Sequence, residues 1–189
     1  GEFTFNFVMP IDINYSNESG RLVFYAINDS LDTEANGYSE SFTVGGVSSS
    51  SDDDSEGPQL YAYLNTEDFE NGGRVNSTPY FVAQLSDESG INYSGSGLGH
   101  DLLLTIDGDA SQTYILNDYY TGEFGDFTRG VVGYSIPQLD EGRHSLTFRA
   151  WDLLNNSSST TLDFVVDGDL KPVMLNLTAS QNQALVSTN

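Results

Sequence analysis

An Asp-Gly-Asp triplet occurs twice in this chain, at Asp107-Gly108-Asp109 and at Asp167-Gly168-Asp169. Carboxylates around a glycine that permits a sharp turn are oxygen ligands of the kind that calcium prefers. A complete calcium site needs further oxygens, for which Asp87-Glu88 and Asp152 are candidate donors. Asp and Gly also favour ordinary turns at strand ends. We expect turns at both triplets and keep Asp107 and Asp109 as candidate calcium ligands.

The residues needed for nucleophilic catalysis are scarce. His100 and His144 are the only histidines, and the chain has no cysteine. A His-based catalytic pair needs a nucleophile beside an oriented base. We expect His144 on the polar face of a strand, opposite the side of Leu146, and the two histidines lack the spacing of shared metal ligands. No catalytic residue is assigned, so the chain alone is predicted not to be an enzyme.

Residues 95–99 (GSGLG) have the glycine content of a phosphate-binding loop. Such loops follow a strand and open a helix, whose N-terminus holds the anion. Here the glycines precede the strand-like residues 102–106 in a strongly acidic chain. We predict a tight backbone connection at this position instead of an anion site.

Residues 117–129 (NDYYTGEFGDFTR) combine aromatic and acidic side chains. We predict a long loop here, which either docks a partner or folds down as a lid over one end of the domain. Aromatic side chains are strong interface anchors, and flanking carboxylates steer a basic partner. The candidate partner-binding residues are Tyr119, Tyr120, Phe124 and Phe127. A sugar platform made of the same rings is an alternative that requires them to be exposed and coplanar.

The charge balance excludes several classes of ligand. The chain of 189 residues has 28 acidic and 6 basic residues, for a formal net charge of -22. Such a field repels nucleic-acid phosphates and anionic lipid, so neither is an expected partner. Divalent cations remain possible ligands, and we therefore predict no cofactor except calcium. No apolar run approaches the roughly 18–20 residues of a membrane span.

The elements that must position these residues are β-strands, because apolar residues alternate with polar ones along most of the chain. Seven alternating segments follow Pro58, at 60–64, 81–85, 102–106, 114–116, 131–136, 146–150 and 162–166. Seven short strands in roughly 110 residues, separated by Gly, Asn, Asp and Ser, are typical of an immunoglobulin-like antiparallel sandwich. Asn155-Asn156 is expected to form the tight turn between the last two strands.

The domain organisation follows from the same pattern. Alternating segments at 3–7, 22–26 and 42–44 precede the polar stretch SSSSDDDSE, and three strands cannot close a sandwich. We expect residues 1–47 to be the C-terminal part of a preceding β domain and 48–56 to be an acidic Ser/Asp linker. Residues 57–167 are expected to form the immunoglobulin-like sandwich, and 168–189 a linker with the start of a further β domain. The fold class is thus all-β, with partial β domains at both ends.

Several stretches, taken in order, carry a resemblance to a known family. They are Gly57-Pro58 with YAYLN at 61–65, LSDESGIN at 85–92, GLGHDL at 97–102, LNDYY at 116–120, GRHSL at 142–146 and AWDLLNNSS at 150–158. In this order and spacing they resemble the region after the peptidase domain of PorU-type sortases. These are gingipain-like cysteine peptidases of the type IX secretion system in Bacteroidota. The resemblance covers most of the chain, but Asn182-Gln183 stands where the family tends to have Asn-Pro.

The resemblance implies a parent that removes the C-terminal sorting domain from secreted cargo and joins the cargo to an anionic lipopolysaccharide. It implies a place at the cell surface, on the extracellular face of the outer membrane. This segment would be a non-catalytic scaffold that positions the peptidase domain or docks partners, such as an outer-membrane barrel protein and secreted cargo. The catalytic Cys and His of the family belong to a domain absent here, so neither is carried over. Two alternatives stay open: an adhesin or carbohydrate-binding module, and a calcium-stiffened structural spacer.

Overall fold

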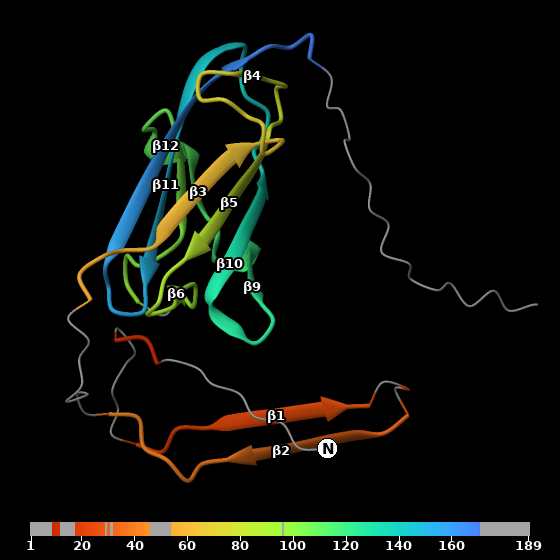
Figure 1. Ribbon diagram of the computed structural model, residues 1–189, viewed down its shortest axis with the longest axis vertical. Coiled ribbons are helices and arrows are strands. Elements are labelled where there is room, and N and C mark those ends of the chain that lie inside the picture. The colour runs from red at the N-terminus through yellow and green to blue at the C-terminus, as the bar shows by residue number, and fades with distance from the viewer. Residues whose placement is uncertain are drawn as a thin grey trace, which may run out of the picture.

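The computed structural model describes residues 9–11, 18–28, 30, 32–45, 54–95 and 97–170 (Figure 1). Within these residues the chain is all β, apart from the short 3-10 helices η1 (Ala110–Gln112) and η2 (Asn117–Tyr119). The all-β class predicted from the alternating residues is confirmed. The strand expected at 3–7, most of the expected linker and the expected start of a further domain lie outside the described residues.

A four-stranded antiparallel sheet contains β3 (Gln59–Leu64), β5 (Tyr80–Ser86), β10 (Asp126–Ser135) and β9 (Tyr120–Glu123), in that spatial order. Its strands alternate between a buried and an exposed face, as the sequence pattern predicts. In β5, Phe81, Ala83 and Leu85 are buried, whereas Tyr80 and Gln84 are exposed. One face of this sheet therefore covers the core and the other faces solvent.

The second sheet has β4 (Arg74–Val75), β12 (Ser157–Val166), β11 (Gly142–Asp152), β7 (Leu103–Ile106) and β8 (Thr113–Ile115) in order. The two-residue strand β6 (Ile91–Asn92) pairs with the end of β11. Strands β11 and β12 form a long hairpin, and Asn155 in its turn has φ +69°, which confirms the expected tight turn. The pair β12–β4 is parallel, in contrast to the expected antiparallel pairing.

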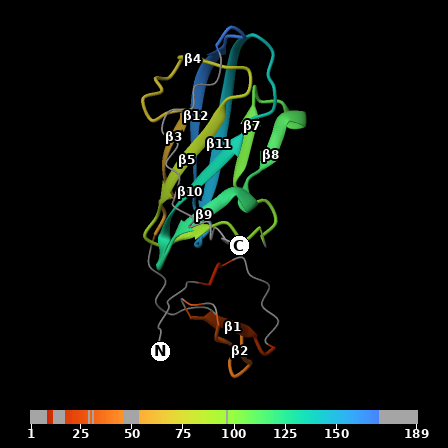
Figure 2. The same ribbon diagram turned by 90° about the vertical axis from the view of Figure 1, so that its right-hand side faces the viewer.

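The buried side chains of both sheets form one hydrophobic core. We call β3 to β12 the two-sheet unit, and Figure 2 shows its ribbon from the side. Phe81 from β5 and Phe148 from β11 meet with ring centroids 5.2 Å apart, which joins the two layers. Both are fully buried, and Leu104 and Phe164 lie in the same cluster. Each such side chain contributes about 1.5–3 kcal/mol by leaving water, before the entropy cost of folding is subtracted.

The remaining strands, β1 (Leu22–Ile27) and β2 (Glu34–Ser39), pair only with each other and lie apart from the two-sheet unit in Figure 1. The strand expected at 22–26 is thus confirmed. At 42–44 the structure has an isolated bridge between Ser19 and Thr43 where we expected a strand. Tyr25, at 61% exposure, and Tyr38, at 65%, show that the hairpin buries little.

Residues 117–129 do not form the long loop that the sequence predicts. They contain η2, the whole of β9, a tight turn at Phe124-Gly125 and the start of β10. Gly125 has φ +76°, a conformation that glycine adopts without steric cost and that closes a tight hairpin turn. Strand pairing therefore fixes the backbone of most of this segment, and the side chains along each strand point alternately to the two faces of the sheet.

Candidate functional site

Tyr120 lies at the start of β9 and packs against the hydrophobic core. Its ring stacks on that of Tyr93, with centroids 4.6 Å apart and an interplanar angle of 20°. It also fills the space beside Gly130, where an added Cβ would lie 2.3 Å from the Tyr120 ring. Burial raises the pKa of Tyr120 to about 12, with smaller contributions from Tyr93 and Asp126. Tyr120 is therefore a strand residue that covers part of the core, and its role as a partner-binding residue stays a prediction.

The other three candidate anchors point in different directions. Tyr119 meets Tyr134 edge-on, with centroids 4.9 Å apart, and is about half exposed. Phe127 lies against Gly90, where an added Cβ would come within 2.7 Å of its ring. Phe124 stands at the hairpin tip with its side chain wholly exposed. The structure brings the four rings onto one hairpin and the segment before it, but Tyr120 packs on the core, so the four rings are not all exposed as a sugar platform needs.

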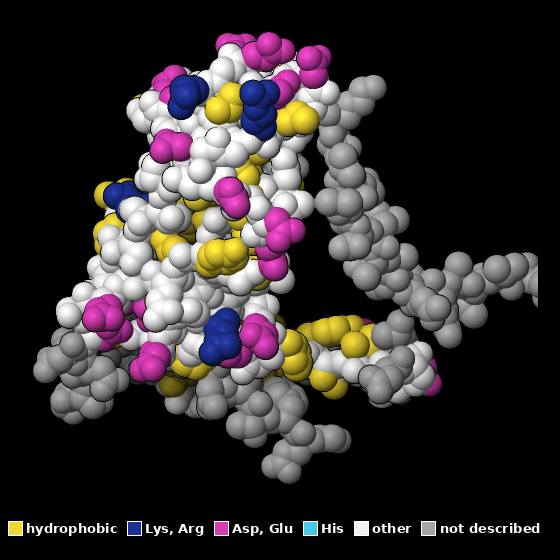
Figure 3. Space-filling view, turned by 45° about the horizontal axis from the view of Figure 1, so that its top comes forward, with side chains coloured by type: hydrophobic (Ala, Val, Ile, Leu, Met, Phe, Trp, Pro, Cys, Tyr) yellow, Lys and Arg dark blue, Asp and Glu magenta, His cyan; other side chains and the backbone are white. Residues whose placement is uncertain are grey.

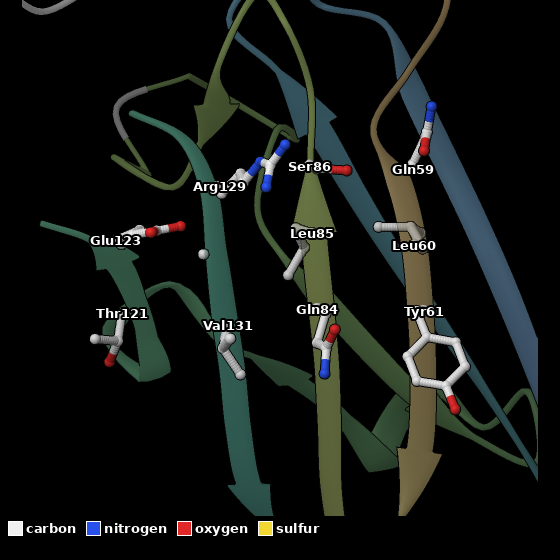
Figure 4. A pocket seen from close by; sticks show the side chains of 12 residues that line it. Gln59, Leu60, Tyr61, Gln84, Leu85, Ser86, Thr121, Glu123, Arg129 and Val131 are labelled. Atoms are coloured by element: carbon white, nitrogen blue, oxygen red, sulfur yellow. The ribbon is translucent and has the colours of Figure 1, made fainter. Parts of the chain in front are cut away.

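The outer face of the four-stranded sheet carries rows of side chains that strand register brings together. One row runs from Tyr61 on β3 through Gln84 on β5 and Val131 on β10 to Thr121 on β9. The neighbouring row runs from Gln59 through Ser86 to Arg129, and Glu123 lies beside it. These side chains line an open groove of about 760 Å³, seen from close by in Figure 4. We call it the outer groove.

Hydrogen bonds hold the side chains at one end of the outer groove. The Tyr61 hydroxyl donates to the backbone oxygen of Glu67 at 3.3 Å, and Gln84 Nε2 donates to Glu67 Oε1 at 3.2 Å. The Tyr61 ring remains 52% exposed. Tyr63, the next outward residue of β3, lies with its ring centroid 5.8 Å away. On the face drawn in Figure 3, hydrophobic side chains lie among acidic ones.

Three carboxylates meet at one end of the two-sheet unit. Asp54, Asp87 and Asp152 each offer one oxygen, and these oxygens lie within 4.8 Å of one another. Oxygens of this kind suit a divalent cation, although calcium takes about six to eight of them. Two of the three, Asp87 and Asp152, are donors that the sequence proposed, whereas Asp54 lies in the expected linker. The structure gathers them without Asp107 or Asp109.

The same carboxylates organise turns. Asp152 is fully buried and accepts hydrogen bonds from Leu154 N at 2.9 Å, Asn156 N at 2.6 Å and Asn156 Nδ2 at 2.8 Å. Asp54 accepts a hydrogen bond from Ser89 Oγ. The pKa of Asp87 is raised to about 6, chiefly by burial and also by the charges of Asp152 and Asp54, against backbone hydrogen bonds that lower it.

The first Asp-Gly-Asp triplet forms a turn, as predicted: Asp107 has φ +52° and Gly108 has φ +67°. Asp107 Oδ2 lies 2.7 Å from His144 Nδ1, and its Oδ1 accepts a hydrogen bond from Ser145 N at 2.8 Å. Asp109 caps η1 by accepting from Ser111 N at 2.8 Å. Both carboxylates are thus used within the chain, and their assignment as calcium ligands stays a prediction.

His144 lies on the inward face of β11, on the same side as Leu146, so the expectation that it faces the opposite side was wrong. Residues two apart in a strand share a face, which places 144, 146 and 148 together. Its ring stacks on Phe164 at 5.6 Å, and its Nε2 lies 2.9 Å from the Asp140 carbonyl oxygen. Burial alone would lower the pKa of His144, but the hydrogen bonds to Asp107 and Asp140 outweigh it and raise the pKa.

His100 makes a ring contact, and the glycine-rich segment before it has the backbone angles of a tight connection. The His100 ring lies 4.4 Å from that of Trp151. Gly95 has φ +62° and Gly99 has φ +84°, and the segment leads into β7 with no helix between, as expected of a tight connection. No helix among the residues that the structure describes is long and apolar enough to cross a membrane.

Comparison with solved structures finds an informative relative. The chain is similar to dimeric latent PorU from Porphyromonas gingivalis, with 39% sequence identity and a TM-score of 0.62. The similarity covers 86% of this chain and 15% of that one, so the chain corresponds to a small part of a PorU-like protein. The resemblance inferred from the ordered sequence stretches is confirmed.

A second solved structure, the endo-beta-1,4-mannanase from Thermotoga petrophila, shares 8% identity over 59% of this chain and 20% of that one. Its TM-score of 0.38 is too low to support an argument about fold or function. No family model and no curated protein matches the chain.

Proposed function

We propose that this segment of a PorU-like protein is a non-catalytic scaffold of a cell-surface sortase, which positions the peptidase domain or docks secretion partners. The observation that supports it most is the 39% identity to PorU across 86% of the chain. The chain contains no cysteine, so the nucleophile of a cysteine peptidase must come from elsewhere in the parent. Because the chain spans 15% of that relative, the parent's activity would reside in the remainder.

The scaffold is best described as an immunoglobulin-like sandwich over 57–167, joined by the linker 48–56 to the end of a preceding β domain at 1–47. Residues 168–189 would supply a linker and the start of a further β domain, most of which lies outside the described residues. Two sheets that share one core, with hairpin connections and a long final hairpin, support this architecture. A compact two-layer unit suits a scaffold because its side chains are fixed by packing, which makes it a rigid spacer.

Docking would use the tip of the β9–β10 hairpin. Phe124 is wholly exposed there, and a large apolar ring at a protruding tip is an effective interface anchor. Glu123 and Asp126 flank it, and hydrogen bonds from Thr128 hold the pKa of Asp126 below its usual value. These charges would steer a basic surface toward the ring. Candidate partners are other domains of the parent, an outer-membrane barrel protein and secreted cargo, at the extracellular face of the outer membrane.

The scaffold role is tested by deleting residues 57–167 from the PorU-like parent. We expect the shortened parent to retain hydrolysis of a small peptide but to stop removing sorting domains from cargo. The purified chain of 189 residues should cleave neither substrate. Normal cargo processing by the deleted parent, or cleavage by the purified chain, would contradict the proposal.

The docking role is tested separately with Phe124→Ala in the parent. Ile115→Ala is the matched control, because Ile115 is also exposed but lies on β8 of the other sheet. We expect slower cargo processing in Phe124→Ala and unchanged processing in Ile115→Ala, at equal folded stability. Unimpaired processing by a stable Phe124→Ala parent would remove the hairpin tip as a docking site and leave the scaffold role intact.

A further inference from the structure

The outer groove has a mixed lining, in which amide and charged side chains lie beside the exposed Tyr61 and Val131. Protein interfaces have an apolar centre that is poor in charged residues. Here the exposed side chains along the groove include the amides of Gln59 and Gln84, the guanidinium of Arg129 and the carboxylate of Glu123. Strand register holds them side by side across β3, β5, β10 and β9. The groove therefore presents a ladder of hydrogen-bonding groups.

Tyr61 is the one aromatic residue in the lining of the groove, so it supplies the flat ring face there. In Figure 4 its ring is seen face on, so the ring face is turned toward the opening of the groove. Its hydroxyl is engaged with Glu67, while 52% of the residue remains exposed. The ring is thus anchored at its edge and open on its face. An anchored ring loses little conformational freedom when a ligand stacks on it.

We propose that the outer groove binds a neutral oligosaccharide, with one pyranose ring stacked on Tyr61. A pyranose has an apolar C–H face for an aromatic ring and a rim of hydroxyls that donate and accept hydrogen bonds. Gln84 lies directly across from Tyr61 in the strand register, where its amide can serve the hydroxyls of the stacked sugar. Thr121 and Arg129 lie farther along the groove, where they meet the following sugar units.

Charge selects a neutral glycan over an anionic one. The chain has a formal net charge of -22, which repels polyanions. Within the groove the single guanidinium of Arg129 is accompanied by the carboxylate of Glu123. The groove shares Glu123 with the hairpin tip proposed above for docking, but its stacking ring, Tyr61, lies on β3, at the opposite edge of the sheet from β9.

The experiment uses the full chain and titrates it with cellohexaose, mannohexaose and xylohexaose by calorimetry. Polygalacturonate serves as the anionic comparison. The variants are Tyr61→Ala, Tyr61→Phe and Gln84→Ala, and Tyr38→Ala is the matched control, an exposed tyrosine of the β1–β2 hairpin. Unfolding of each variant is recorded first, because an exposed side chain should leave stability within about 0.5 kcal/mol.

We expect at least one neutral hexasaccharide to bind and Tyr61→Ala to weaken its binding roughly tenfold or more, since stacking is lost. Tyr61→Phe, which keeps the ring, should retain most of the affinity, and Tyr38→Ala should bind like the unchanged chain. Binding that is equally strong in Tyr61→Ala would overturn the assignment to this groove. Absence of binding to all three neutral sugars, or binding of polygalacturonate alone, would overturn the proposed ligand class.

Discussion

The rings of Tyr93 and Tyr120 stack at 4.6 Å and thereby tie the edge strand β9 to the segment that follows β6. Because Tyr120 also packs on the core, Tyr120→Ala should lower the free energy of unfolding by about 3 kcal/mol. Phe124→Ala removes a wholly exposed ring and should change it by less than about 0.5 kcal/mol. Urea unfolding, followed by the fluorescence of the single Trp151, measures both. Equal losses of stability in the two variants would contradict the assignment of Tyr120 as a packed residue and Phe124 as an exposed one.

The contact between Asp107 and His144 predicts a pH-dependent stability. The pKa of His144 is raised in the folded state. The stability that protonated His144 adds to the fold is therefore fully present below the ordinary pKa of 6.5 and is lost as the pH rises through the folded-state pKa. Asp107→Asn should therefore destabilise the chain more at about pH 5.5 than at about pH 8.5. Asp109→Asn, from the same triplet, is the control and should show no such difference. A loss for Asp107→Asn that is the same at both pH values would contradict the pairing.

The raised pKa of Asp87 predicts a second pH dependence of folding stability, in which a charged group lowers the stability instead of raising it. Its pKa rises from 3.8 to about 6 on folding, chiefly through burial. Above the folded-state pKa the carboxylate is charged, and its burial lowers the stability of the fold by the full amount. This loss of stability becomes smaller as the pH falls toward the unfolded-state pKa. Asp87→Asn, whose amide oxygen can still accept the Ser89 N–H, should stabilise the chain at about pH 8 and lose that gain below about pH 4.5. Glu88→Gln, at an exposed neighbour, is the control, and a gain at Asp87→Asn that persists in acid would refute the burial effect.

Gly57 makes a close contact between the start of β3 and the start of β12. A Cβ added there would lie 2.4 Å from the backbone carbonyl carbon of Ser157, and backbone cannot move aside cheaply. Gly57→Ala should lower the free energy of unfolding by about 1–3 kcal/mol. Gly37→Ala, where an added Cβ meets nothing within 4 Å, should change it by less than about 0.5 kcal/mol. Thermal unfolding of both variants checks this, and an undamaged Gly57→Ala would show that the two strands are not packed so closely.

Strands with a buried apolar face could be predicted from the sequence. Phe81, Ala83 and Leu85 alternate with polar or exposed residues, and β5 lies where this pattern places it. Strand β9 was missed because Tyr120 and Gly122 share its inward side, and a glycine leaves no apolar signal. Strands β4 and β6 have two residues each, which is too short for any period to show. Strand β2 is polar and exposed, so nothing in its composition marks it.

The site residues were harder to predict, because they depend on register and on distant segments. Tyr61, Gln84 and Val131 look like ordinary outward positions of separate strands, and only the pairing of β3, β5 and β10 places them in one row. Asp54 comes from a stretch read as linker, yet it meets Asp152 across the fold. A count of alternating positions would have placed His144 on the same side as Leu146. Aromatic content made residues 117–129 a candidate segment, but it could not separate Tyr120, which packs on the core, from the exposed Phe124.

The close contact of Gly57 with Ser157 means that β3 and β12 begin at the same end of the two-sheet unit and run in the same direction (Figure 1). The polypeptide thus arrives at one pole and departs from the other, after the ten residues of β12. A pull applied to the flanking segments would act along both strands. The hydrogen bonds of β3 with β5 and of β12 with β11 would then be loaded simultaneously in shear, instead of opening one after another like a zipper. Strands loaded in this way would resist extension more than strands that separate one hydrogen bond at a time.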